Sequence, residues 1–209
     1  MAVAFTVHAL KGRRRVAAAA LGLLALGAPA LSACTSGGGV SGGGGYINYV
    51  AANDPGMSTV PLGHRPAAPQ ISGTTLSGQK LSLSQYQGHI VVLNVWGSWC
   101  SQCREEGPAL EETYQKYQAK GVDFLGINTR DDNAAAQAYV AETGITYPSL
   151  QDPDETLVLQ FKTIFPATTV PSTVILDQQG DVAVRVLGGV TEPELEQQLN
   201  ALLAAPAKS

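Results

Sequence analysis

The chain has 209 residues, a hydrophobic content of 44% and a formal net charge of −4. This length predicts one globular domain with additional sequence at an end, and the composition is that of neither a fibrous nor a wholly disordered chain. Because no long run of Lys and Arg is available to contact phosphates, the sequence argues against a nucleic-acid-binding protein.

Residues 1–33 have the order of an export signal, in which a basic head precedes an apolar segment and small residues. The uncharged segment, 16–31, is shorter than the roughly 20 residues that a transmembrane helix needs. The letters LSAC at its end resemble a bacterial lipobox, which implies cleavage before Cys34 and diacylglycerol on its thiol. An uncleaved signal anchor with a free Cys34 is the alternative. Cleavage would remove four basic and no acidic residues, taking the net charge from −4 to −8, so membrane attachment would rest on the lipid.

Residues 34–70 are predicted to form a flexible tether, because they are rich in Gly, Pro and Ser and include SGGGVSGGGG. A flexible chain of this length has a root-mean-square span of roughly 30–35 Å. We therefore expect a domain at 71–209 that reaches partners near a membrane without lying on it.

Strands and helices alternate from residue 71 onwards. The run 89–96 is almost continuously apolar, which is typical of a central strand covered on both faces. The other predicted elements are a hairpin at 74–83 with its turn at Ser77-Gly78, helices at 103–120 and 133–143 that stop at Gly121 and Gly144, a strand at 122–128, a helical segment at 153–162, a strand pair at 171–177 and 181–188, and a helix at 191–203 that opens with a capping box of Thr191 and Glu194. This order predicts an α/β fold with a mixed central sheet, helices on both faces and an N-terminal β-hairpin extension.

Cys100 lies where the central strand gives way to the first long helix, and Cys103 lies one turn further on. A helix N-terminus carries partial positive charge and free N–H groups, which favour a thiolate. The spacing therefore predicts that Cys100 is the exposed nucleophile and that Cys103 attacks the resulting mixed disulfide.

The cysteine pair could also bind a metal ion or form a purely structural disulfide. A zinc site needs about four ligands, and the histidines outside the signal, His64 and His89, do not have the spacing of a zinc finger; copper is disfavoured because no His or Met lies near the pair. We therefore expect no metal and no cofactor. A structural disulfide in a redox-inactive binding module is the remaining alternative, although closing so short a loop adds little stability.

The motif WCSQC after a buried strand, followed by Pro108 and by VPSTVILD, resembles thioredoxin-fold proteins. The stretches VLNVWGSWC and CREEGP, together with the lipobox, resemble the TlpA/ResA-like membrane-anchored thiol-disulfide oxidoreductases over most of residues 71–204. The resemblance implies a thioredoxin-like fold, exported thiol or disulfide proteins as substrates, a membrane electron donor of thiol-disulfide type, and action as a reductant, with apocytochrome c among the substrates. A disulfide oxidant and a peroxidase on the same fold are the alternatives; the segment GSWC fits a peroxidatic cysteine poorly.

The same resemblance assigns roles to residues around the predicted Cys100–Cys103 disulfide. Glu106 lies on the same side of the helix as Cys103, and an acid at this position tunes cysteine protonation in the family; a solvated helix carboxylate is the alternative.

Asn94 stands where ordinary thioredoxins have an aspartate, and an amide cannot move protons, so Glu106 is the predicted proton shuttle. Pro171 matches a cis proline that faces the cysteines, with Val170 offering backbone groups to an extended substrate. Trp99 is expected to cover the disulfide or to contact the partner protein.

Overall fold

The computed structural model describes residues 50–51 and 56–205. The predicted signal peptide, the lipobox with Cys34 and the first part of the predicted tether lie outside the described residues.

Among the described residues, seven strands form one mixed sheet in the order β1-β2-β9-β8-β5-β6-β7. The central strand β5 (Ile90–Trp96) is buried along its whole length, as its continuous apolar sequence predicts. It pairs in parallel with β6 (Val122–Thr129) and antiparallel with β8 (Ser172–Leu176). The remaining strands of this sheet are β1 (Val50–Ala51), β2 (Met57–Thr59), β7 (Ser149–Asp152) and β9 (Val182–Leu187).

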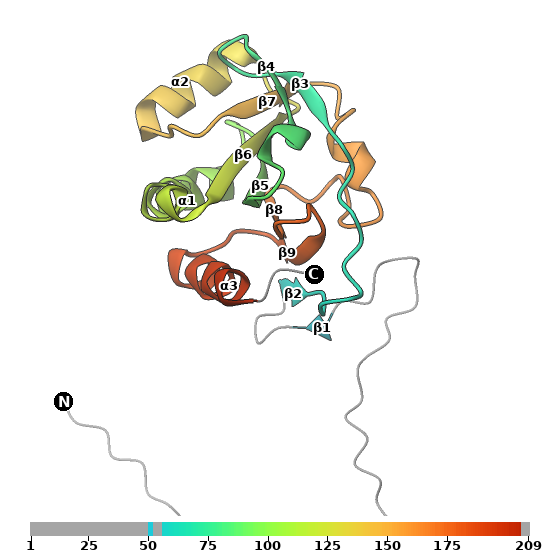
Figure 1. Ribbon diagram of the computed structural model, residues 1–209. Coiled ribbons are helices and arrows are strands. Elements are labelled where there is room, and N and C mark those ends of the chain that lie inside the picture. The colour runs from blue at the N-terminus through green and yellow to red at the C-terminus, as the bar shows by residue number, and fades with distance from the viewer. Residues whose placement is uncertain (1–49, 52–55, 206–209) are drawn as a thin grey trace, which may run out of the picture. The chain divides into compact units, whose positions relative to one another are not determined.

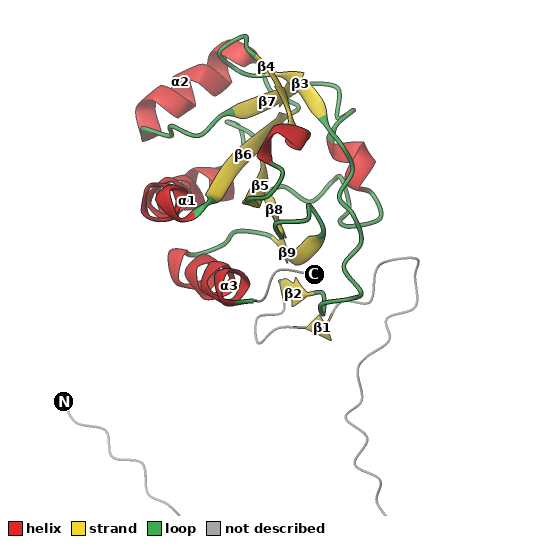
Figure 2. Ribbon diagram, viewed as in Figure 1, coloured by secondary structure: helices red, strands yellow, loops and turns green. Residues whose placement is uncertain are grey.

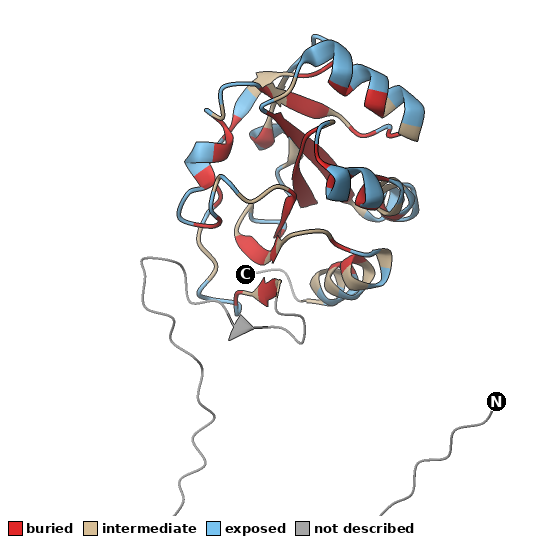
Figure 3. Ribbon diagram, turned by 180° about the vertical axis from the view of Figure 1, so that it is seen from behind, coloured by how far each residue is buried: buried red, intermediate tan, exposed pale blue. Residues whose placement is uncertain are grey.

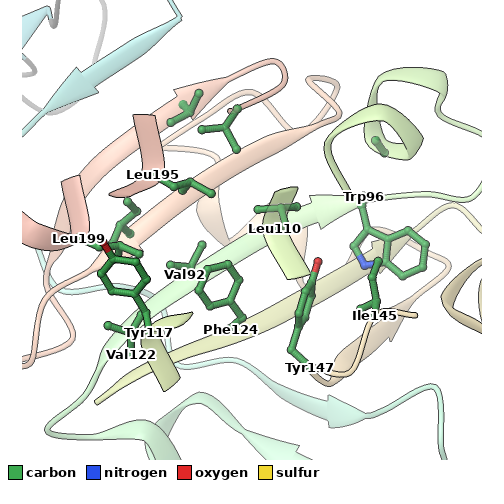
Figure 4. Packing of buried hydrophobic residues seen from close by; sticks show 14 of the residues in the cluster. Val92, Trp96, Leu110, Tyr117, Val122, Phe124, Ile145, Tyr147, Leu195 and Leu199 are labelled. Carbon is green, nitrogen blue, oxygen red and sulfur yellow. The ribbon is translucent and has the colours of Figure 1, made fainter. Parts of the chain in front are cut away.

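The three α-helices lie on one face of the sheet (Figures 1 and 2). They are α1 (Ser101–Tyr117), α2 (Asn133–Thr143) and α3 (Glu192–Ala204). Leu110 of α1 and Leu195 of α3 meet Phe124 of β6 in the core beneath them (Figure 4). Each such side chain contributes roughly 1.5–3 kcal/mol when fully buried.

The opposite face of the sheet is covered by shorter elements. These are the 3₁₀ helices η1 (Leu83–Tyr86) and η3 (Val158–Phe161), whose Leu83, Val158 and Phe161 pack on a second cluster with Leu93. A further 3₁₀ helix, η2 (Gln118–Lys120), extends α1. The central strands are thus buried from both sides, while the outer surfaces of the α-helices are exposed (Figure 3). The prediction of helices on both faces is met on this second face by 3₁₀ helices.

Several local signals act as predicted. The hairpin forms from β3 (Ser72–Thr74) and β4 (Lys80–Ser82), with Gly78 in the left-handed region at its turn. Gly144, also left-handed, ends α2 and donates its N–H to the Val140 carbonyl. The capping box of Thr191 and Glu194 opens α3.

The tether prediction is wrong for residues 56–70, which belong to the folded domain. β2 pairs antiparallel with β9, and the N–H of Val60 donates to the Ala183 carbonyl at 2.8 Å. Arg65 forms an ion pair of 2.9 Å with Asp177, and Ala68 is buried. Composition missed this segment because its stability comes from pairing with a strand more than a hundred residues later.

The prediction of a helix at 153–162 is also wrong, except for the single turn η3. The Asp152 carboxylate accepts hydrogen bonds from the N–H groups of Leu157 and Val158, both at 2.9 Å. Glu155 takes a positive φ of 59°, which ends a right-handed helix. These side-chain bonds replace the regular helical pattern, since an Asp side chain competes effectively for nearby N–H groups.

Candidate active site

Cys100 and Cys103 are joined by a disulfide where β5 leads into α1. Cys100 is the N-cap residue of α1, and its Sγ accepts a hydrogen bond of 3.1 Å from the Cys103 N–H. This placement lets the first turn of the helix stabilise negative charge on the Cys100 sulfur once the disulfide is reduced.

The expectation that Cys100 is exposed needs correction. Its exposed fraction is 6%, against 2% for Cys103, so the difference in access between the two is small in the disulfide form. The Sγ atom of Cys100 lies 3.9 Å from the Val170 carbonyl oxygen. In a disulfide this sulfur carries no proton, so the contact is one of packing rather than a hydrogen bond.

The segment that faces Cys100 contains the predicted cis proline. The Val170–Pro171 peptide bond is cis, as the resemblance implied. Pro171 is buried at the start of β8, and its carbonyl accepts from the Gly188 N–H at 3.0 Å. Val170 is partly exposed, and its carbonyl oxygen lies beside the Cys100 sulfur.

Glu106 is buried, with an exposed fraction of 5%, and is not the solvated carboxylate of the alternative prediction. One carboxylate oxygen accepts from Asn94 Nδ2 at 2.9 Å and the other accepts from the Val190 N–H at 3.0 Å. Burial raises the pKa of Glu106 from 4.5 to about 7, although the hydrogen bonds from Asn94 and Val190 act in the opposite direction.

Asn94 forms hydrogen bonds with two different elements of the site. It lies on β5, and its Nδ2 donates both to Glu106 and to Thr173 Oγ1, the latter at 3.2 Å. The amide therefore ties the carboxyl of α1 to the strand β8 that follows Pro171.

Tyr139 is a site residue that sequence reasoning missed. Its hydroxyl donates to the Cys103 carbonyl oxygen at 3.1 Å, and the Arg104 guanidinium lies 5.2 Å from the centre of its ring. Burial raises the pKa of Tyr139, and the neighbouring charge of Glu106 adds to that increase. No signal in a single sequence connects Tyr139 with a cysteine 36 residues away.

Trp99 is half exposed next to Cys100. Its indole N–H donates to the Thr129 carbonyl at 3.1 Å, and the Arg130 guanidinium lies 4.7 Å from the ring centre. The preceding residue, Ser98, donates twice to the Asp131 carboxylate. Sequence reasoning missed these contacts as well, because the loop that makes them follows a different strand.

Within the described ranges, no group of three or more His, Cys, Asp or Glu side chains is arranged to hold a metal ion. His89, one of the two histidines outside the predicted signal, lies 2.5 Å from a carboxylate oxygen of Asp123. Of the helices that the structure describes, none has the length and apolar character needed to cross a bilayer.

Known proteins are similar to this chain in sequence and in fold. The profile of the AhpC/TSA family matches residues 65–185. The thiol-disulfide oxidoreductase ResA of Geobacillus kaustophilus is 31% identical over 135 residues, which is 65% of this chain and 75% of that protein. The ResA of Bacillus subtilis is 26% identical over the same length, covering 73% of that protein.

Two solved structures have the same architecture. A DsbF homologue from Corynebacterium diphtheriae has a TM-score of 0.67 and 35% identity, over 73% of this chain and 96% of that one. A secreted thiol-disulfide isomerase from Corynebacterium glutamicum has a TM-score of 0.69 and 30% identity, over 74% and 96% of the two chains. This chain is accordingly an enzyme that exchanges thiols and disulfides on a thioredoxin-like fold, and it belongs to the AhpC/TSA family and, within it, to the ResA-like thiol-disulfide oxidoreductases.

Proposed function

We propose that this chain reduces disulfides of exported proteins outside the cytoplasm, with Cys100 as nucleophile and Cys103 as resolving thiol. The observation that carries the proposal is the position of Cys100. Its Sγ accepts a hydrogen bond from the Cys103 N–H in the first turn of α1 and lies beside the Val170 carbonyl. A substrate segment lying along Val170 would bring its disulfide to the sulfur that the helix favours as a thiolate.

The exchange proceeds in two steps. The Cys100 thiolate attacks one sulfur of the substrate disulfide, forms a mixed disulfide and expels the other substrate sulfur as a thiolate, which takes up a proton from water. Cys103 then attacks Cys100 Sγ, which releases the second substrate thiol and forms the Cys100–Cys103 disulfide. Two electrons have then passed to the substrate. A membrane donor of thiol-disulfide type reduces the Cys100–Cys103 disulfide again by the same chemistry.

Glu106 serves as the base for the second step. Cys103 is buried, and burial disfavours its thiolate. The Glu106 carboxyl lies three residues further along the same helix, and a pKa of about 7 suits it to accept a proton near neutral pH. Asn94 and the Val190 N–H hold that carboxylate in place.

The reducing direction rests on the similarity to ResA proteins, and the reduction potential of the cysteine pair tests it. We expect a value near that of thioredoxin, about −270 mV, measured by equilibration with defined glutathione or dithiothreitol mixtures. A value near that of a dedicated oxidant, about −120 mV, would instead assign disulfide formation to this chain. Insulin reduction by the wild type, and its loss in Cys100→Ser, separates either enzyme from a redox-inactive binding module.

The extracytoplasmic location is supported by the export signal in the sequence and by the secreted relative from Corynebacterium glutamicum. We further propose that Cys34 carries the lipid that attaches the chain to the cell membrane, with apocytochrome c among the proteins within reach. The mature wild type should partition into detergent with a modified N-terminal Cys34, and Cys34→Ala should remain unprocessed. An unmodified chain that begins at another residue would contradict this part of the proposal.

A further inference from the structure

The segment from 129 to 132, which runs from the last residue of β6 to the N-cap of α2, contacts the segment 97–99 that leads into Cys100. The Thr129 carbonyl accepts a hydrogen bond from the Trp99 indole, and the Arg130 guanidinium lies over the ring of Trp99. The next residue, Asp131, accepts a hydrogen bond from the Ser98 N–H. None of these loop residues is needed for the exchange steps described above.

Asp131 makes the most specific of these contacts. Its Oδ2 accepts from the Ser98 N–H at 2.6 Å and from Asn128 Nδ2 at 2.8 Å. Its Oδ1 accepts from the Ser98 hydroxyl at 2.8 Å and from the Asp132 N–H at 2.9 Å. A carboxylate offers about four acceptor positions and no donor, so all of its hydrogen-bonding capacity is used here.

No other side chain of this size matches that set of partners. An asparagine would place an NH2 group against either the Ser98 and Asn128 donors or the Ser98 and Asp132 donors. In the first orientation the Ser98 N–H loses its acceptor and in the second the exposed Asp132 N–H does, and in both the remaining hydrogen bonds go to a neutral amide oxygen, which is a weaker acceptor than a carboxylate.

The segment held in this way determines where Cys100 lies. The Cys100 N–H donates to the Gly97 carbonyl at 3.1 Å, so the two residues between them form a tight turn that begins at the end of β5. The Trp99 ring folds back over Gly97, where an added Cβ would overlap the indole. A shift of Ser98 would therefore move the turn, and with it the Cys100 sulfur relative to the Cys103 N–H.

We propose that Asp131 is a positioning residue for the nucleophile: it fixes Ser98 so that Cys100 stays at the N-cap of α1, with its sulfur hydrogen-bonded to the Cys103 N–H. The proposal rests on the proposed role of Cys100 as the nucleophile. Asp131 acts through the backbone of 98–100 and takes no part in the transfer of electrons or protons.

The chain offers a matched control in Asp132, the next residue. The Asp132 carboxylate caps α2 by accepting from the N–H groups of Ala134 and Ala135, and it makes no contact with Ser98. Asp132→Asn removes the same charge one residue away, and Asn is an equally good N-cap residue. Comparing Asp131→Asn with Asp132→Asn therefore separates the anchoring of Ser98 from the loss of a nearby negative charge.

The test measures two properties of the reduced protein: the pH profile of Cys100 alkylation by iodoacetamide, and the rate of mixed-disulfide formation with a disulfide-bonded peptide. In Asp131→Asn we expect the alkylation midpoint to move to higher pH and the exchange rate at pH 7 to fall about tenfold, the size of effect that one lost hydrogen bond to a charged group produces. In Asp132→Asn both should stay within about twofold of the wild type.

Two results would overturn the positioning role. One is an Asp131→Asn variant that matches Asp132→Asn in both measurements. The other is a midpoint that moves to lower pH, because the carboxylate would then act only as a nearby negative charge. If Asp131→Asn does not fold, as judged by its unfolding transition, Ser98→Ala takes its place; it removes one of the two Ser98 donors, and an unchanged midpoint and rate would equally refute the proposal. A wild type without Cys100-dependent exchange would refute the proposed function instead.

Discussion

Asn94 can form a hydrogen bond with Glu106 whether the carboxyl is ionised or protonated. With Glu106 ionised, Asn94 Nδ2 donates to it and to Thr173. If the amide turns about its last torsion, its oxygen can accept from a protonated Glu106 and from the Thr173 hydroxyl. An aspartate at position 94 would bring a second negative charge to this buried place, whereas the amide lets Glu106 alone change its charge.

The variant Glu106→Gln removes the proposed base while preserving this network. The new side-chain oxygen can accept from the Val190 N–H, and its NH2 group can donate to the turned Asn94. We expect formation of the mixed disulfide through Cys100 to stay near the wild-type rate and its resolution by Cys103 to slow by about a hundredfold, the lower range for a general base. Stopped-flow measurement of mixed-disulfide decay checks this.

The exposed Glu105 on the same helix supplies the control, as Glu105→Gln should decay like the wild type. Equal decay rates in all three proteins would assign Glu106 a structural role.

The raised pKa of Glu106 also predicts how stability depends on pH. The folded protein holds this proton more tightly than the unfolded chain, with a pKa of about 7 against 4.5. The contribution to stability is therefore complete below pH 4.5, declines as pH rises and is lost above about pH 7. Its size is on the order of 3 kcal/mol.

Urea unfolding of the oxidised protein between pH 4.5 and 8 measures this contribution. The wild type should lose stability relative to Glu106→Gln as the pH rises, because the glutamine carries no titrating proton. Tyr139 and Tyr147 lie near the carboxyl, but burial raises the pKa of each above 10, so neither titrates in this range. Parallel stability curves for the two proteins would contradict the shifted pKa.

At the scale of elements, the active site depends on the close approach of α1 and α2. Gly107 of α1 leaves room for the Tyr139 hydroxyl, which an added Cβ would overlap. The hydroxyl donates to the Cys103 carbonyl within the first turns of α1, just before Pro108, which has no N–H for the Arg104 carbonyl. Tyr139 therefore links the two helices at the part of α1 where its own hydrogen bonding is interrupted.

Gly107→Ala should destabilise the protein by about 2 kcal/mol, because overpacking forces the buried Tyr139 to shift and to lose its bond to Cys103. Without this contact, alanine would stabilise the helix by up to about 1 kcal/mol. Chemical unfolding checks the sign, with Glu112→Ala on the exposed side of the same helix as the control. A stabilised Gly107→Ala would show that Tyr139 moves aside at no cost.

At the scale of the whole molecule, local patterns predicted the parts of the fold that local interactions determine. The apolar run of β5, the glycine that ends α2 and the capping box of α3 all predicted their elements. The sequence also placed the cysteines at the start of α1 and pointed to Glu106, which the structure shows to be buried. It did not predict β2 or β7, since short strands of three and four residues acquire their structure by pairing with distant strands.

The site contacts that went unpredicted have the same origin. Asp131 and Tyr139 reach the cysteine segment from the loop and helix that follow β6, and only the parallel pairing of β5 with β6 brings them there. Neither residue type indicates such a role, because an aspartate is common just before a helix and a tyrosine within a helix is explained by packing in the core.

The pairing of β2 with β9 leads to a prediction about where the domain begins. Met57 and Val60 are buried, and Arg185 of β9 donates to Ser58 Oγ at 3.1 Å. A chain that starts at residue 71 lacks these contacts and the ion pair of Arg65 with the buried Asp177. Each buried apolar side chain is worth roughly 1.5–3 kcal/mol, so the loss is comparable to the whole stability of a typical domain, about 5–15 kcal/mol.

We expect the oxidised fragment 71–209 to be largely unfolded or to melt far below the fragment 50–209, which keeps β1 and β2. Thermal unfolding of both fragments and of the full mature chain measures the difference. Fragment 50–209 keeps every contact described above and should therefore match the mature chain. Arg65→Gln in 50–209 isolates the ion pair and should account for only a part of the loss, since Met57 and Val60 remain buried. If 71–209 melts with 50–209, the segment 56–70 lies on the domain without stabilising it, and the boundary at residue 71 predicted from composition would be the energetic one.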